Sequence, residues 1–436
     1  MSLPQCFNNP EEYFEESLKF FQEYQYLFNY PNTDLLIHNI LDKITIKDED
    51  IDVFNKDFDL SSIDNEFLSD FFIKLKKLQF FYDNIQVDSL ENNINVPVSP
   101  KKKHEILHLA KEIKEACEHV GCEVVVDFGS GLGYLDQLLF ETTNHKILGI
   151  ECNESHYVGA KKRQRKYHSS STDNVKYIKH TVTENSQENI EGYLKDKFNN
   201  HREFCITGLH ACADLTIDAI NLFLKMSHAK TMVIMPCCYH KMVEYGGVFK
   251  NFPLSDCLKG LFRRFKGDEY MGVPFLRLAA QPPSVDDKLE DLVFNLLSRA
   301  VLQTFAFKHN FKLKRKKRKA VKIKNMGNNF EVYIEDATTN GFSIIKIESS
   351  DDNDKVDNPK FCLEELMTLW HQLTRFTFTK AGIFILLQNY LQPVIENFVL
   401  FDRLVYLKEK GVNHCEFKKI LDVKISPRCL ALLAYK

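Results

Sequence analysis

The segment VVVDFGSGLGY (124–134) contains the residues best suited to ligand binding. A β-branched run ends at Asp127, and Gly129, Gly131 and Gly133 follow at intervals of two before an apolar pattern resumes. Glycines let a backbone approach a ligand closely, and a helix that begins after them offers unpaired N–H groups. The segment therefore predicts a ligand-binding loop at the end of a strand.

The spacing of these glycines limits the class of ligand. The dinucleotide fingerprint G-x-G-x-x-G requires glycine at position 134, where this chain has Tyr134, so a nicotinamide or flavin cofactor is disfavoured. S-adenosylmethionine has no phosphate but has an amino-acid portion and a ribose. Glu151, at the end of the next expected strand, is placed to accept hydrogen bonds from the ribose hydroxyls. We expect S-adenosylmethionine here; the alternative is a tight strand-to-helix turn of another α/β protein.

Two later segments, GLHACADLT (208–216) and MPCCYHKM (235–242), carry side chains suited to act on a methyl acceptor. In a first interpretation, His210, Asp214 or His240 orients or deprotonates an acceptor hydroxyl or amine, while the sulfonium of the donor is the electrophile.

The cysteines of these segments allow further interpretations. In the second, Cys212 or Cys237 adds covalently to a pyrimidine ring. In the third, Cys212, Cys237, Cys238 and His240 bind Zn²⁺, but adjacent cysteines chelate one tetrahedral ion poorly and C-x₂-C spacing is absent, so we expect no metal. The thiols also suit plain apolar packing. We expect four residues to face the acceptor: His210, Asp214, Cys237 and His240.

Alternating strand and helix patterns must position these residues. Five apolar, β-branched runs are separated by segments able to form helices, and they predict strands at 123–128, 146–151, 175–180, 204–209 and 230–235. Such alternation builds a Rossmann-like α/β fold, a mostly parallel sheet with helices on both faces, and ligands bind at the carboxyl ends of its strands.

The remaining sequence is divided by composition. We expect an N-terminal helical domain at 1–95, a donor-binding core at 96–245, a helical and basic accessory region at 246–411, and a C-terminal segment at 412–436 that returns to the edge of the sheet. Within the accessory region, the patterns predict helices at about 287–308 and from 361 to 411, and strands at 330–336 and 342–347.

Composition restricts partners and environment. With 57 basic and 60 acidic residues the formal net charge is −3, so any nucleic acid must be held by a local patch, such as KKRQRKYH (161–168) or KLKRKKRKAVKIK (312–324). Scattered cysteines and an N-terminal region without an apolar core predict a reducing, intracellular location, cytoplasmic or nuclear. The stretch AGIFILLQNYLQPV (381–394) is too short to span a bilayer, so no membrane association is expected.

Four segments in order, SPKKKHEI, VVDFGSGLGYLDQLL, GLHACADLT and MPCCYHKM, together resemble the methyltransferase-like protein 25 group, which includes a ribosomal-RNA adenine dimethylase-domain-containing member. The resemblance covers about residues 95–245 and is weaker in FDRLVYLKEKG and ISPRCLALLA. It implies a class I S-adenosylmethionine-dependent methyltransferase, and it suggests that Lys102, Lys103 and His104 approach the donor or acceptor. The alternative for SPKKKHEI is a helix start at Ser99 and Pro100.

The segments GLHACADLT and MPCCYH are also similar, locally, to those of tRNA 2′-O-ribose methyltransferases. Enzymes that methylate adenine N6 usually present an Asn/Asp-Pro-Pro-aromatic loop after the fourth strand, where this chain reads GLHACAD, so adenine dimethylation is not expected. The sequence predicts a methyltransferase with RNA as its acceptor. A protein methyltransferase and a non-catalytic, methyltransferase-like scaffold are the alternatives.

Overall fold

The computed structural model describes residues 3–47, 51–55, 57–83, 98–143, 145–199, 203–282, 288–316, 328–346 and 360–436. The chain forms two compact units, each built from segments that are distant in sequence. Unit 1 comprises Met1–Lys19, Lys77–Pro283 and Gln392–Lys436, and unit 2 comprises Phe20–Lys76 and Ser284–Leu391. All expected site residues lie in unit 1. The division into four segments made from the sequence stays a prediction.

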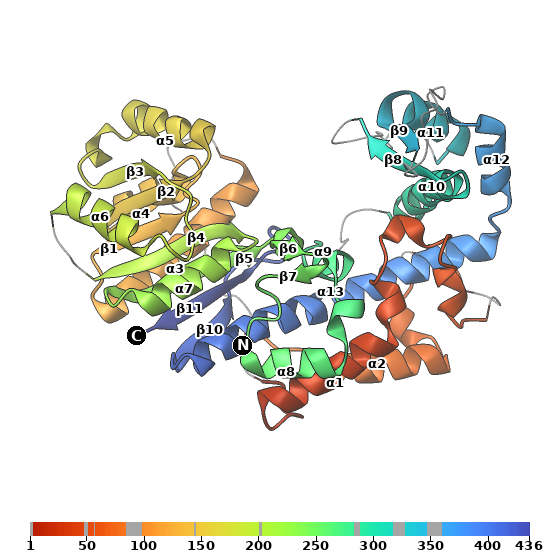
Figure 1. Ribbon diagram of the computed structural model, residues 1–436, viewed down its shortest axis with the longest axis horizontal. Helices are drawn as coiled ribbons and strands as arrows, with labels where there is room; N and C mark the ends of the chain where they lie inside the picture. Colours follow the sequence, from red (N-terminus) through yellow and green to blue (C-terminus); the bar gives the residue numbers. More distant parts are fainter. Residues whose placement is uncertain are drawn as a thin grey trace. The chain divides into compact units, whose positions relative to one another are not determined.

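Unit 1 contains a seven-stranded sheet in the order β10-β11-β5-β4-β1-β2-β3 (Figure 1). Strands β1 to β5 are parallel, and β11 is antiparallel to both β5 and β10. The strands are β1 Val124–Phe128, β2 Lys146–Glu151, β3 Val175–Lys179, β4 Phe204–Cys212, β5 Ala229–Cys237, β10 His414–Lys419 and β11 Leu430–Tyr435. All five predicted core strands are confirmed.

The C-terminal strand returns to the sheet as predicted, but its place differs. The chain end was expected at the edge of the sheet, whereas β11 is inserted between β5 and β10. The edge strand β10 was not predicted, because its sequence HCEFKK is largely polar and Phe417 is its one fully buried side chain. An edge strand with one solvated face has no continuous apolar run to reveal it.

Helices cover both faces of this sheet. Helices α3 (Pro100–Val120), α4 (Tyr134–Thr143) and α5 (Glu154–Tyr167) share one apolar core with the sheet. Helix α7 (Leu215–Lys225) packs on β4 and β5 with residues outside that core, and α6 (Gln187–Phe198) connects β3 to β4. The order reverses between β1 and β4, where the crevice for ligands opens in doubly wound sheets. The predicted Rossmann-like class I methyltransferase fold is confirmed.

Helix α3 begins where the sequence predicts a helix start. The Ser99 side chain accepts a hydrogen bond from the backbone N–H of Lys102 at 3.2 Å, and Pro100 occupies the first turn. This cap fixes the first turn of α3, so Lys102 and Glu105 project from a rigid element.

Further helices and hairpins complete the two units. They are α1 Pro10–Glu23, α2 Glu66–Leu78, α8 Asp256–Arg264, α9 Val273–Ala279, α10 Leu289–Lys308, α12 Leu363–His371 and α13 Arg375–Glu409. Strands β6 Glu244–Tyr245 and β7 Val248–Phe249 form a hairpin, and β8 Phe311–Arg315 and β9 Phe342–Lys346 form an antiparallel pair. The helices predicted at 287–308 and from 361 onward, and the strand at 342–347, are confirmed. Of the basic run 312–324, residues 317–324 lie outside the described part of the chain.

The strand predicted at 330–336 is wrong, because this segment is helix α11 (Phe330–Asp336). The Asn329 side chain accepts a hydrogen bond from Val332 N–H at 3.2 Å and caps the helix. Phe330, Tyr333 and Ile334 then share one helical face and are buried, with the Phe330 ring stacked on Trp370 at 4.1 Å. Helical spacing and the cap outweigh the β propensity of this short run.

Helix α13 is long and apolar enough, by length and composition alone, to cross a membrane. Of its most apolar window, 72% is buried inside the protein. The expectation of no membrane association stays a prediction.

Candidate active site

The glycine loop between β1 and α4 has the backbone that its sequence predicts. Gly129, Gly131 and Gly133 all have positive φ, at 79°, 59° and 72°. A Cβ atom on Gly133 would overlap the hydroxyl of Tyr177, and every L-residue is strained at this φ. Glycine at position 133 is therefore required both by the backbone and by the side chain packed against it.

Glu151 ties the glycine loop to the end of β2. Its buried carboxylate accepts hydrogen bonds from the backbone N–H of Gly131 at 2.9 Å and of Asn153 at 2.7 Å, one at each oxygen. The Cys152 thiol also donates to Oε1, at 3.6 Å, whereas Oε2 keeps a second lone pair for a ribose hydroxyl. The structure thus brings Glu151 and the glycine loop together, and their role in donor binding stays a prediction.

Asp127 of β1 is buried beside Asp136, which lies in the first turn of α4. Burial raises the pKa of Asp127 to about 6, and burial together with the charge of Asp127 raises the pKa of Asp136 further. No donor among the described residues reaches Oδ1 of Asp127 or either oxygen of Asp136. Because two carboxylates can only accept, a proton held between them is needed to satisfy the pair.

This pair makes stability depend on pH. Unfolded aspartates titrate near pH 4, so between about pH 4 and 6 the folded protein holds more protons than the unfolded chain. The associated stabilisation is therefore lost as pH rises across that interval and above. Asp136→Asn supplies an N–H donor to Asp127 at every pH. We expect the variant to be more stable than wild type at pH 8, by about 2–3 kcal/mol since one pKa unit is about 1.4 kcal/mol.

Urea unfolding of wild type and Asp136→Asn at pH 4 and pH 8 measures this difference. It should shrink to near zero at pH 4. Asp218 and Asp402 also have pKa values raised by burial to about 6, but they titrate in both proteins and cancel in the comparison. Equal stabilities at pH 8 would show that the pair carries no shared proton.

Lys102 lies close to two acids, Glu105 of α3 and Asp127 of β1. Its ammonium is 4.0 Å from Oε2 of Glu105, and burial lowers the Lys102 pKa while the charges of Glu105 and Asp127 raise it. The cation is thus held near the end of β1, where it can pair with the carboxylate of a bound amino-acid moiety. His104 is not free for that role, because its Nε2 accepts the backbone N–H of Asp422 at 3.0 Å.

His210 is paired with an acid that the sequence did not reveal. It lies within an irregularity of the β4–β5 ladder, between Gly208 and Ala211, and has a φ of 60°. Its Nε2 lies 3.0 Å from Oε1 of Glu105. The same oxygen accepts the hydroxyl of Ser426 at 2.9 Å. Positive φ in a residue other than glycine costs energy, and such strain concentrates at functional sites.

Glu105 remains ionised in this environment. Its burial by itself would raise the pKa, but the hydrogen bonds from His210 and Ser426 and the charges of His210 and Lys102 bring the pKa below its usual value. Glu105 and Ser426 both lie in segments that carry the family resemblance. An acid on the buried face of α3, directly before Ile106 and one helical turn before Leu109 of the core, was the signal that could have identified it.

Asp214 is engaged away from His210. Its Oδ2 accepts the backbone N–H of Val243 at 2.8 Å and its Oδ1 accepts the side-chain amide of Asn251 at 2.7 Å. Both partners flank the β6–β7 hairpin, so the carboxylate holds this hairpin against the end of β4. The geometry favours a positioning role for Asp214, whereas the sequence predicted direct contact with the acceptor.

Buried hydrogen bonds hold the segment after β5 in place. The buried Tyr239 hydroxyl donates to Oε1 of Glu396 at 2.8 Å, and Arg428 donates to the same oxygen at 2.6 Å. His240, one residue on, is half-buried, and burial followed by the charges of Arg277 and Lys241 lowers its pKa, which favours a neutral imidazole. This buried network was not predicted, because its members are distant in sequence.

The two adjacent thiols of this segment meet a third from β4. Sγ of Cys237 lies 3.0 Å from Sγ of Cys212, and the thiols of Cys212, Cys237 and Cys238 all lie within 4.8 Å of one another. The hydrogen bond between the two thiols lowers the pKa of Cys212 to about 6. The same hydrogen bond, with burial, raises the pKa of Cys237. Cys212 is exposed and Cys237 is buried.

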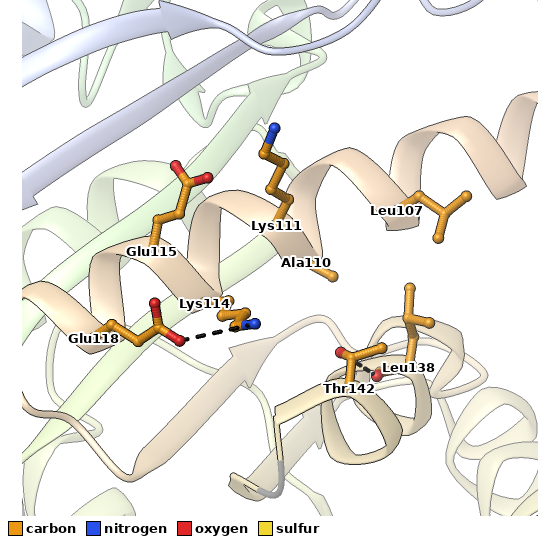
Figure 2. Close-up of a pocket in the computed structure, with 8 residues that line it drawn as sticks. All are labelled: Leu107, Ala110, Lys111, Lys114, Glu115, Glu118, Leu138 and Thr142. Carbon is orange, nitrogen blue, oxygen red and sulfur yellow. Dashed lines mark hydrogen bonds and ion pairs between the residues drawn. The ribbon is translucent and has the colours of Figure 1, made fainter. Parts of the chain in front are cut away.

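A groove of about 360 Å³ lies elsewhere, between α3 and α4. Figure 2 shows Lys111, Lys114 and Glu115 of α3 on one side of it and Leu138 and Thr142 of α4 on the other. None of the expected site residues lines this groove. Its walls are side chains of α3 and α4, and no strand end contributes to them. We therefore assign the site to the sheet edge.

Comparison with known proteins identifies the class of the domain that carries this sheet edge. Residues 101–245 match the family model described as a methyltransferase domain. Together with the sheet order, this match identifies the segment as a class I methyltransferase domain, the class whose methyl donor is S-adenosylmethionine.

The chain is similar to probable methyltransferase-like protein 25 of mouse, with 26% identity over 299 residues, and of human, with 27% identity over 308 residues. These matches cover 64% and 68% of this chain and 44% and 46% of the mouse and human proteins, so the chain spans less than half of these curated relatives. The resemblance seen in the sequence is confirmed.

Among solved structures, the plantazolicin methyltransferase BamL is 12% identical and aligns over 77% of this chain and 84% of its own, with a TM-score of 0.25. That score is below the level at which a shared fold is inferred. The assignment of class therefore rests on the family model and on the order of the strands.

The residues at the sheet edge fit S-adenosylmethionine. The left-handed glycine loop presents backbone without Cβ atoms, Oε2 of Glu151 keeps a free lone pair for a hydroxyl, and Lys102 provides a cation for a carboxylate. These three features suit a donor that needs close approach of the backbone and that carries ribose hydroxyls and an amino-acid carboxylate.

Proposed function

We propose that this protein is an S-adenosylmethionine-dependent methyltransferase that acts on RNA. One observation carries the proposal: a glycine loop tied to Glu151 and an imidazole paired with Glu105 lie at the same edge of one sheet. The first group suits the donor, and the second suits an acceptor that must lose a proton.

The proposed roles follow from hydrogen-bonding capacity. When bound, S-adenosylmethionine supplies a methyl group on an electrophilic sulfonium. If Nε2 of His210 donates its hydrogen to the Glu105 carboxylate, Nδ1 keeps the lone pair that can take a proton from an acceptor hydroxyl or amine. Glu105 then acts as a positioning residue, because it fixes the tautomer and stabilises the protonated ring.

An exposed basic surface supports RNA as the acceptor. Lys162, Arg165 and Lys166 are exposed on α5, the helix that follows Glu151 directly. Arg163 on the same helix lies over the ring of Tyr134 at 3.7 Å. Lysine and arginine clusters bind phosphates with strongly salt-dependent affinity, so this surface suits a polyanion beside the donor site.

Neutralising this surface should weaken RNA binding. For Lys162→Gln/Arg165→Gln/Lys166→Gln we expect the slope of log affinity against log salt to fall by about 2, at roughly 0.7 per lost phosphate contact on single strands. Filter binding of total cellular RNA at several salt concentrations measures the slope. The control is Lys195→Gln/Lys197→Gln on α6, which should keep the wild-type slope; equal slopes for both variants would remove α5 from the RNA site.

Methyl transfer to fractionated RNA and protein tests the function itself. Wild-type protein, labelled S-adenosylmethionine and cell extract are incubated, and the label is followed after ribonuclease or protease treatment. We expect label that ribonuclease removes and protease does not. Label removed only by protease would make the protein a protein methyltransferase, and donor binding without any label would favour a non-catalytic scaffold.

A further inference from the structure

Three cysteines converge where β4 and β5 end. Cys212 and Cys237 are paired across these neighbouring parallel strands, and the three thiols of Cys212, Cys237 and Cys238 lie within 4.8 Å of one another. Among the described residues, no other set of three or more His, Cys, Asp or Glu side chains forms such a potential metal-binding group.

The backbone explains how adjacent cysteines reach the same point. Successive side chains of an extended strand point to opposite faces, which is why adjacent cysteines are poor chelators in a strand. Cys238 leaves the strand with φ 51° and ψ 45°, in the left-handed region. This turn brings its thiol to the side of Cys237, so the sequence argument against a metal here no longer applies.

The distances suit a tetrahedral thiolate site. Zinc–sulfur bonds of about 2.3 Å place sulfurs about 3.8 Å apart in a tetrahedron. This value lies between the 3.0 Å that separates Cys212 from Cys237 and the 4.8 Å limit for all three thiols. Small rotations of the side chains therefore suffice to make the three sulfurs equidistant from one ion.

Backbone strain is concentrated at this place. Cys238 is one of three residues with positive φ, together with His210 and Ala213, in the segments that end β4 and β5. The segment is also anchored by Tyr239, whose hydroxyl bonds to the buried Glu396. A strained, over-determined turn that presents side chains to one point is the arrangement expected of a binding site.

We propose that Cys212, Cys237 and Cys238 form a three-thiolate site for Zn²⁺ with its fourth position open. Three protein ligands and an open position distinguish catalytic from structural zinc sites. Cys212 is exposed, which leaves that side of the cluster accessible. Cys212 follows His210 by two residues in the chain, so the cluster adjoins the segment that carries the proposed base. The site does not depend on the proposed function, because its geometry involves neither donor nor RNA.

Metal titration of the reduced, full-length protein without donor tests the site. Co²⁺ serves as a spectroscopic probe, and Zn²⁺ is measured by competition with a chromogenic chelator. We expect one ion per chain and a sulfur-to-cobalt charge-transfer band that Zn²⁺ abolishes. Cys212→Ser and Cys238→Ser should each lower Zn²⁺ affinity by at least about 100-fold, since loss of an outer partner alone costs 10- to 100-fold.

The control is Cys362→Ser, an exposed cysteine outside the cluster, which should bind like wild type. Thermal unfolding of all proteins without metal shows whether the variants fold, so that lost binding is not lost structure. The proposal is overturned if reduced wild type binds no ion, or if the cluster variants bind as wild type does.

Discussion

Gly133→Ala is expected to abolish measurable donor binding. Alanine at φ 72° costs about 1–2 kcal/mol, and its Cβ would overlap the Tyr177 hydroxyl, so the loop or the tyrosine must move. Movement of the loop separates Gly131 from Glu151 and removes the bare backbone that the donor needs. Calorimetric titration with S-adenosylhomocysteine should show an affinity at least about 100-fold below wild type.

A second glycine provides the matched control. Gly192 lies within α6, and a Cβ there meets no atom within 4 Å. Gly192→Ala should keep the wild-type affinity and gain about 0.5–1 kcal/mol of stability, because alanine is favoured over glycine inside a helix. Wild-type donor affinity in Gly133→Ala would contradict the assignment of the loop.

Glu105→Gln is expected to lower kcat by about 100-fold or more, with little change in donor affinity. Glutamine preserves size and can still accept from Nε2 of His210, but it has no charge to stabilise the protonated imidazole. His210→Gln should lower kcat comparably. Since the two act as a unit, the double variant should lose little more than either single variant. Turnover is measured as labelled methyl transfer, and donor affinity by calorimetry.

Glu112→Gln is the control for this pair. Glu112 is a buried acid on the same helix and is paired with Lys418 at 2.8 Å. It has no assigned role in proton transfer. Its loss should reduce stability without changing kcat. A fall in kcat that is equal in Glu105→Gln and Glu112→Gln would show that α3 acts only through general stability, and additive losses in the double variant would show independent roles.

The sequence was sufficient to predict features that depend on a local pattern of residues. The five core strands, the left-handed glycine loop and the acid at the end of β2 are each encoded within a few residues, so spacing alone located them. Helix α3 begins at the predicted cap for the same reason. Local propensity failed for α11 because its aromatic residues satisfy both a strand and a helix pattern over seven residues.

The partners of the site could not be read from spacing, because folding brings them together. Glu105 and His210 lie 105 positions apart in the chain, and Asp127 meets Asp136 only when α4 packs beside β1. Asp214 was expected to face the acceptor, yet its oxygens are used by a hairpin that begins about thirty residues later. Tertiary contacts decide which polar residues are free for chemistry.

Binding of S-adenosylhomocysteine to Glu151→Gln, measured by calorimetry, tests the central claim most directly. Glutamine has one acceptor oxygen where the carboxylate has two, so the contacts to Gly131 and to ribose hydroxyls cannot all be kept. We predict one site per wild-type chain, an affinity about 10- to 100-fold lower in Glu151→Gln, and no change in Glu154→Gln, an exposed acid three residues away. Equal binding by all three proteins, or no binding by wild type, would contradict a donor site at the ends of β1 and β2.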